Sequence, residues 1–309
     1  MRRALVLNAG ASWAAYQVGA LRHVVGERRM EFDLLAGTGI GAMNAAFVAC
    51  GQFEALADLW RRMSVRRLVR PTLRRWWAGP LSGAPQRAAI AAHVSEERLA
   101  ERGARLLVST VDLRAGALRV LEYPGEDLPL VDGLMAAVAT PGLVAPLDRD
   151  GAQLAEGTLV DSFLLREVLA RGPAEVIAVA AGMPAGATPA RRYRTWRAVS
   201  ERALALNLDH DVRSALDDAA AATQVVAARQ ALAARLRALV TERIPDGSDE
   251  LRARIDALDA DRAAPRLTAI RPSRELGYAL WRFPRRRLRA AATLGHDDAR
   301  AALASEAAP

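Results

Sequence analysis

The residues of this sequence best placed to do chemistry form a short glycine-rich pentapeptide. It consists of Gly37, Thr38, Gly39, Ile40 and Gly41, between an apolar stretch and a run of small helix-forming residues. This is the frame of a nucleophile elbow, Gly-x-Ser-x-Gly, whose central residue stands exposed on a strained strand-to-helix turn. Here the central residue is Gly39, which has no side chain with which to attack. The pentapeptide therefore predicts an acyl-transfer architecture without its nucleophile.

A carboxylate and one hydroxyl are the other candidates. Glu156 is directly followed by Gly157, in the second half of the sequence, and its carboxylate could serve as a general base. Ser12 lies in the loop after the first apolar stretch and is the one hydroxyl that could replace the missing nucleophile. A serine just ahead of a helix more often caps it by accepting a bond from an early N–H group. We therefore interpret Ser12 as a cap and keep catalysis through it as an alternative.

The elements that must position these residues follow from the apolar pattern. Residues 5–24 read as a strand, a small-residue loop and an amphipathic helix, and residues 128–180 end in a further helix and strand. Residues 196–241 are alanine-rich, with apolar residues at the spacing of one or two long helices. Ser248 is a candidate N-cap for the next helix. Residues 266–273 read as a late strand.

Three blocks in this order resemble the patatin-like phospholipases, lipid acyl hydrolases that use a serine–aspartate dyad. The loop before Ala-Tyr-Gln is similar to the family's glycine-rich loop, and the elbow before Asn-Ala is similar to its nucleophile turn. Glu156-Gly157-Thr158 is similar to its aspartate motif. The resemblance covers most of residues 4–181, and the helical end LGHDDARAAL resembles the family's close.

The resemblance implies an α/β fold: three layers, with a mainly parallel central sheet flanked by helices and a helix-rich C-terminal half. Residues 1–181 would form the α/β core, and residues 182–309 a helical region that packs on it and completes the same domain. The strand at 266–273 would rejoin the sheet. No cofactor and no metal ion are implied.

Each functional block departs from the family's pattern. Relative to that pattern, Gly39 stands at the nucleophile position and Glu156 at the base position, where the added methylene shifts the carboxylate by about 1.5 Å. In the family the first loop offers N–H groups to an oxyanion, and alanine in place of glycine narrows its backbone angles. That loop here has alanines at three family glycines and Trp13 at the family's arginine; its positions are Ala9, Gly10, Ala11, Ser12, Trp13 and Ala14.

We therefore expect a protein that has lost Ser-Asp lipid hydrolysis and works as an acyl- or lipid-binding protein or a regulatory pseudoenzyme. One alternative is a lipid acyl hydrolase, or another acyl-transfer enzyme, with non-standard catalytic residues. Another is a peripheral membrane scaffold. The sequence names no protein partner.

The net charge of +8 comes entirely from arginine, since the chain has no lysine. Codon bias is the first explanation. Two clusters mix arginine with aromatic residues, as suits an anionic membrane surface. The first runs from Trp60 to Trp77 and the second from Trp281 to Arg287, and the candidate surface residues are Arg74, Arg75, Trp76, Trp77, Trp281 and Arg285. No nucleic-acid-binding motif accompanies the charge, so no nucleic-acid partner is expected.

The remaining signals concern compartment and metals. The sequence has no apolar run long enough to span a membrane, and its first residues lead directly into a strand, so no signal peptide is predicted. The single cysteine, Cys50, is predicted to be a core residue. We expect a cytoplasmic protein, at most peripheral to the inner face of the membrane.

The histidines show no metal-ligand spacing, so no metal site is predicted; they are His23, His93, His210 and His296. Asp209 and Asp211 flank His210, and this triplet reads as a solvated helix surface.

Overall fold

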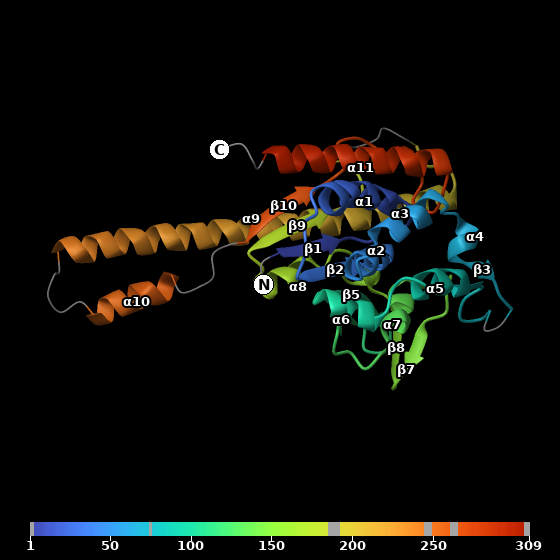
Figure 1. Ribbon diagram of the computed structural model, residues 1–309, viewed down its shortest axis with the longest axis horizontal. Coiled ribbons are helices and arrows are strands. Elements are labelled where there is room, and N and C mark those ends of the chain that lie inside the picture. Colours follow the sequence, from blue (N-terminus) through green and yellow to red (C-terminus); the bar gives the residue numbers. More distant parts are fainter. Residues whose placement is uncertain (1–2, 74–75, 185–191, 244–248, 260–264, 306–309) are drawn as a thin grey trace.

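A central sheet organises the computed structural model, which describes residues 3–73, 76–184, 192–243, 249–259 and 265–305 (Figure 1). Within these residues the sheet has eight strands in the order β10-β9-β1-β2-β5-β8-β7, with β6 also paired to β5. The strands are β1 (Arg3–Leu7), β2 (Leu34–Thr38), β5 (Arg105–Asp112), β6 (Ala117–Tyr123), β7 (Leu147–Arg149), β8 (Ala152–Glu156), β9 (Glu175–Val179) and β10 (Arg266–Ile270). From β10 to β5 neighbouring strands are parallel, and β6, β7 and β8 pair antiparallel.

Helices cover both faces of the sheet. They are α1 (Ala15–Leu21), α2 (Ile40–Ala49), α3 (Phe53–Arg61), α4 (Val65–Leu68), α5 (Ala84–Ala91), α6 (Glu96–Arg102), α7 (Leu130–Ala137), α8 (Leu165–Ala170), α9 (Trp196–Arg243), α10 (Asp249–Asp259) and α11 (Arg285–Ser305). Short 3₁₀ turns are η1 (Ala11–Ala14) and η3 (Gly157–Leu159), η2 (Arg22–Glu27) is a π-helix, and β3 (Arg70–Pro71) pairs with β4 (Leu81–Ser82).

The two faces of β1 belong to two different parts of the core. Leu5 and Leu7 pack with α1, α2 and α11, whereas Ala4 and Val6 pack with α8 and α9. This follows from the alternation of side chains along a strand. A mainly parallel sheet between two helical layers is the predicted fold class, which is confirmed.

Helix α11 docks on α1 through two glycines. A Cβ atom on Gly19 would lie 1.7 Å from the carbonyl oxygen of Ala292, and one on Gly295 would lie 2.0 Å from that of Tyr16. The two helix backbones are therefore in direct contact, and any larger residue would force them apart. The phenol of Tyr16 also donates to Asp298, 3.0 Å away. Helix α11 is thus held on α1. The division of the domain into residues 1–181 and 182–309 stays a prediction.

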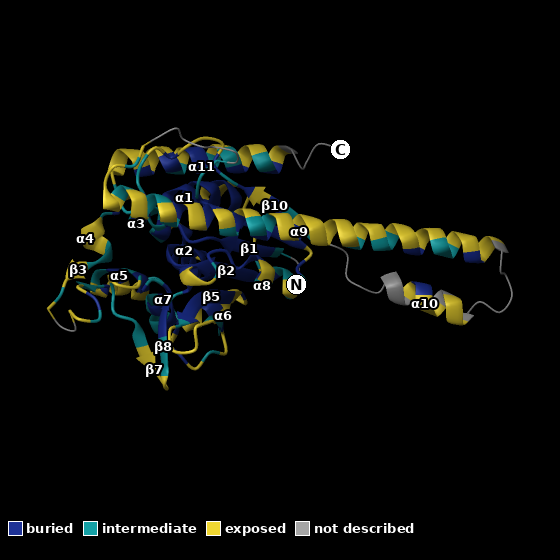
Figure 2. Ribbon diagram, turned by 180° about the vertical axis from the view of Figure 1, so that it is seen from behind, coloured by how far each residue is buried: buried dark blue, intermediate teal, exposed yellow. Residues whose placement is uncertain are grey.

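The alanine-rich segment is one helix, α9, of 48 residues. It crosses the body and projects well beyond the sheet, where α10 lies beside it (Figures 1 and 2). Ala233 and Val240 of α9 pack there against Ile255 of α10. The candidate cap Ser248 lies outside the described residues.

Several sequence expectations meet the structure here. Cys50 is buried, and β10 joins the sheet beside β9, as predicted. The prediction for the aspartate–histidine triplet is wrong for Asp209, which is buried and pairs with Arg271 at 2.8 Å and Arg213 at 2.9 Å. Arg271 directly follows β10, and Arg213 lies one turn further along α9. Neither arginine was predicted from the sequence to pair with Asp209.

The four histidines were expected to be scattered, and for His23 and His296 this expectation is wrong. Docking of α11 brings His296 to His23, with ring centroids 5.6 Å apart. No helix in the described ranges is both long enough and apolar enough to cross a membrane.

Candidate functional site

Gly39 occupies the turn that joins β2 to α2. Its backbone angles are φ 57° and ψ −131°, in a region that favours glycine. The flanking glycines serve packing: a Cβ on Gly37 would lie 2.5 Å from the nitrogen of Ala42, and one on Gly41 would lie 2.3 Å from the carbonyl oxygen of Asn8. The tight turn predicted for the elbow is therefore present, at the carboxyl end of a buried parallel strand.

Glu156, at the end of β8, reaches this turn. A Cβ atom on residue 39 would lie 2.6 Å from Oε1 of Glu156 and 3.5 Å from the Cβ of Ala9. The three blocks that the sequence singled out therefore meet at one point. Because real Cβ contacts are essentially never so short, the carboxylate lies where a side chain on residue 39 would begin.

The carboxyl group of Glu156 is held by two threonines. Thr140 donates to Oε2 at 2.8 Å, and Thr158 donates to Oε1 at 2.9 Å. Burial raises the pKa of Glu156, and these two hydrogen bonds offset part of that rise. In the described part of the chain no arginine or histidine pairs with it. Its environment therefore favours the neutral acid more than water would.

The loop after β1 keeps a glycine-like conformation despite its alanines. Ala11 has φ 41°, in the left-handed region, which for a residue with a Cβ costs on the order of 1–3 kcal/mol. The N–H of Ala9 donates to the carbonyl oxygen of Ser162 at 2.9 Å. Within the described residues, the N–H groups of Gly10 and Ala11 have no protein acceptor.

Ser12 and Trp13 tie this loop to the C-terminal segment. The N–H of Ser12 donates to the carbonyl oxygen of Leu280 at 3.1 Å, and its hydroxyl donates to the same atom at 2.7 Å. Trp13 Nε1 donates to the carbonyl oxygen of Tyr278 at 3.0 Å. The Tyr278 hydroxyl in turn donates to the carbonyl oxygen of Ser12 at 3.0 Å. The capping interpretation of Ser12 is wrong, because η1 starts after Gly10 without a side-chain cap. Ser12 is buried and clamps two distant segments.

A buried chain of amides holds the loop against the elbow helix. Gln17 donates to Oδ1 of Asn8 at 3.0 Å and accepts from Nδ2 of Asn44 at 2.9 Å. Oδ1 of Asn44 accepts from the indole of Trp60 at 2.9 Å. These roles were missed, although Gln17 and Asn44 stand in the Ala-Tyr-Gln and Asn-Ala motifs that the resemblance quoted. Trp60 is thus buried, which contradicts its place in an arginine–aromatic surface.

An apolar cavity of about 570 Å³ opens beside Gly39, and we call it the elbow cavity. Ala11, Ile40 and Glu156 border it next to the turn. Its other lining residues are Val65, Leu68, Val69, Leu81, Gln86, Val138, Thr140, Leu143, Val144, Trp196, Arg197, Ser200, Glu201, Leu204, Trp281 and Phe283. Thr140 and Glu156 supply polar groups next to the turn, α9 supplies Arg197, Ser200 and Glu201, and most of the wall is hydrocarbon.

The remaining surface candidates separate into two groups. Trp281 is half-buried, packs against the core and lines the elbow cavity, so its assignment to the outer surface is corrected. Arg285 is exposed at the start of α11. Trp76 and Trp77 are 65% and 72% exposed. Arg74 and Arg75 lie outside the described residues.

Comparison with known proteins finds a matching family and matching solved structures. The sequence profile of the patatin-like phospholipases matches residues 5–169. A solved structure, VipD from Legionella pneumophila, is 14% identical, with 98% of this chain and 67% of that chain covered and a TM-score of 0.48. No curated protein matches the chain.

Proposed function

Because the chain belongs to the patatin-like phospholipase family, we propose that it binds an acyl-chain lipid in the elbow cavity and does not hydrolyse it. One observation carries this proposal. The place where a nucleophile's Cβ would lie is 2.6 Å from Oε1 of Glu156, so the turn carries no hydroxyl at residue 39 and a carboxyl group lies in that space. A carboxyl group in that place blocks the approach of a substrate carbonyl to residue 39.

The shape of the elbow cavity supports an acyl chain as ligand. Its volume of about 570 Å³ is that of a small-molecule site, and its wall is mostly aliphatic and aromatic. At the elbow end, the N–H group of Ala11, which borders the cavity, can meet a carbonyl or carboxyl headgroup. An amphiphile with one polar end and one hydrocarbon chain matches both parts.

Displacement of a fluorescent fatty acid tests the binding half of the proposal. Leu204 of α9 lines the elbow cavity, so the larger side chain of Leu204→Trp should obstruct it and weaken binding by at least about tenfold, given that overpacking costs about 1–3 kcal/mol once the ligand is bound. Leu206→Trp is the matched control, since Leu206 is 44% exposed on the same helix and does not line the cavity. Equal affinity in both variants would place the ligand elsewhere.

A second candidate function is hydrolysis through non-standard residues. It is favoured by Glu156, a carboxyl group with a raised pKa beside unpaired N–H groups, because such a group can act as general base toward water. Ester hydrolysis above the uncatalysed rate that disappears in Glu156→Gln would select this function. Fluorophosphonate labelling that disappears in Ser12→Ala would instead select Ser12 as the nucleophile.

A membrane-facing role is compatible with lipid binding. Leu73, Trp76 and Trp77 are strongly exposed between β3 and β4, and residues of α4 and β4 line the elbow cavity. We propose that Leu73, Trp76 and Trp77 contact an anionic membrane close to the cavity. Aromatic rings favour the headgroup level of a bilayer, which supports this placement.

A further inference from the structure

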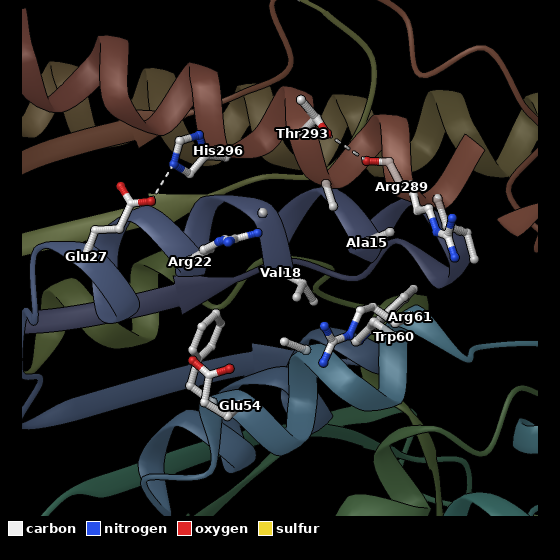
Figure 3. A pocket seen from close by; sticks show the side chains of 15 residues that line it. Ala15, Val18, Arg22, Glu27, Glu54, Trp60, Arg61, Arg289, Thr293 and His296 are labelled. Carbon is white, nitrogen blue, oxygen red and sulfur yellow. Dashed lines mark hydrogen bonds and ion pairs between the residues drawn. The ribbon is translucent and has the colours of Figure 1, made fainter. Parts of the chain in front are cut away.

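Two histidines and one glutamate converge where η2 meets α11. His23 Nδ1 lies 2.8 Å from Oε2 of Glu27, and His296 Nε2 lies 2.9 Å from Oε1 of the same carboxylate. Figure 3 shows His296 above Glu27, with the interaction dashed between them. The two ring planes stand at 87°. One carboxylate thus joins imidazoles that are far apart in sequence.

The second nitrogen of His296 already has a partner. Its Nδ1 lies 3.2 Å from Oδ1 of Asp297. In metal sites a histidine commonly donates its non-ligating N–H to a carboxylate, which fixes the ring and directs the other nitrogen to the metal. Asp297 stands in that place, and it leaves Nε2 directed at Glu27.

We propose that His23, Glu27 and His296 bind one Zn²⁺ ion. Their ligand atoms all lie within 4.8 Å of one another. Zn²⁺ with bonds of about 2.1 Å places tetrahedral ligands about 3.4 Å apart, so the widest pair of ligand atoms must close by at most about 1.4 Å. Glu27 can adjust to the ion, since its side chain is half exposed at the end of η2, and the rings of His23 and His296 must supply any approach of their own nitrogens. Two imidazoles and one carboxylate are a donor set that Zn²⁺ favours.

Two of the three proposed ligands, Glu27 and His296, border open space. Glu27 and His296 line a cavity of about 630 Å³ between α1, α3 and α11, separate from the elbow cavity (Figure 3). The ion can therefore enter from solvent and keep a water or an anionic group as its fourth ligand. Arg22 and Arg289 line the same cavity and would favour an anion there.

The ion would join the first helical segment to the last. His23 and Glu27 lie on η2, and His296 lies on α11 next to Gly295, where the two helices touch. An ion that binds only this arrangement stabilises the folded chain. None of the three ligands lines the elbow cavity, so this inference is independent of the function proposed above.

Titration calorimetry of the chelator-treated full chain with ZnCl₂ tests the proposal. We expect one site per chain and, with Co²⁺, the visible absorption of a tetrahedral ion. Glu27→Gln and His296→Asn should each weaken Zn²⁺ binding by at least about tenfold, and Asp297→Asn should weaken it less. His210→Asn is the matched control, because His210 is an exposed histidine between two aspartates on α9 and should bind no more than adventitiously.

Thermal melts keep the test valid if a variant is less stable. Each variant is compared with its own chelator-treated form, so that only the Zn²⁺-dependent rise in Tm is scored. The proposal requires that rise in the parent and in His210→Asn, and its loss in Glu27→Gln. No saturable site in the parent, or equal binding by the parent and both ligand variants, would overturn it.

Discussion

At the scale of residues, positions 39 and 156 depend on each other. Gly39 tolerates its positive φ, and Glu156 places its carboxyl group in the space that glycine leaves open. A serine at 39 must accept the backbone angle and also displace a carboxyl group held by Thr140 and Thr158. Restoring a serine at residue 39 therefore also requires the carboxyl group of Glu156 to move.

We predict that Gly39→Ser lowers the free energy of unfolding by about 1–3 kcal/mol from backbone strain, and further because Glu156 must move. Gly39→Val should cost more, since β-branched residues tolerate positive φ worst. Gly142→Ser is the control, because Gly142 also has positive φ but has nothing within 4 Å of its Cβ position. Urea titrations of the three variants measure the difference. A Gly39→Ser variant as stable as the parent would mean that the turn is relaxed.

Adding Glu156→Asp to Gly39→Ser should recover part of that loss, because the shorter side chain withdraws from residue 39. Ester hydrolysis by the double variant should exceed that of Gly39→Ser and remain weak, since Ser12 and Trp13 keep the loop clamped to the C-terminal segment. Robust hydrolysis by Gly39→Ser alone, assayed with p-nitrophenyl esters, would contradict this.

The carboxyl group of Glu156 also predicts a pH dependence. Burial raises its pKa above the ordinary 4.5, so the folded state favours the protonated form. That contribution to stability is complete below about pH 4.5 and is lost as the pH rises through the raised pKa. The parent should therefore lose stability relative to Glu156→Gln from about pH 4.5 upward. A stability difference that stays constant from pH 4 to pH 8 would contradict the raised pKa.

At the scale of elements, the contact between α1 and α11 depends on missing side chains. Replacing a helical glycine with alanine normally stabilises a helix by up to about 1 kcal/mol. Gly19→Ala and Gly295→Ala should instead destabilise by about 3 kcal/mol or more, because each new Cβ would overlap a backbone carbonyl that no rotamer can move. Gly182→Ala, with open space at its Cβ position, is the neutral control. Thermal melts decide, and a neutral Gly295→Ala would show that the helices lie farther apart.

The same contact explains how much of the site could be predicted. The elbow turn, Glu156 and the late strand, predicted over residues 266–273 and observed over Arg266–Ile270, were found because each depends on local spacing and a short motif. The clamp at Ser12, the position of Trp281 in the elbow cavity and the meeting of His23 with His296 were missed. All three arise because residues 278–296 dock on the N-terminal loop and helix, and no local pattern encodes a contact between such distant segments.

At the scale of the whole molecule, the exposed tryptophans predict how the protein meets a bilayer. It should sediment with anionic liposomes, and less so at high salt, because exposed charges are screened within about 8 Å at physiological ionic strength. The double variant Trp76→Ala/Trp77→Ala should weaken sedimentation without lowering Tm. Val225→Ala, at a 59% exposed apolar residue of α9, should leave it unchanged. Equal recovery with neutral and anionic liposomes would show that the arginines do not contribute to membrane binding, and would leave codon bias as the explanation of their number.

The central claim joins two statements about one cavity: an acyl lipid binds there, and its ester survives. Native mass spectrometry of the full chain incubated with a long-chain phospholipid tests both together. We predict a non-covalent complex of one chain with one intact phospholipid, absent in Leu204→Trp. A covalently acylated chain, or release of free fatty acid with lysophospholipid, would contradict this claim and would show that the protein is a lipid acyl hydrolase.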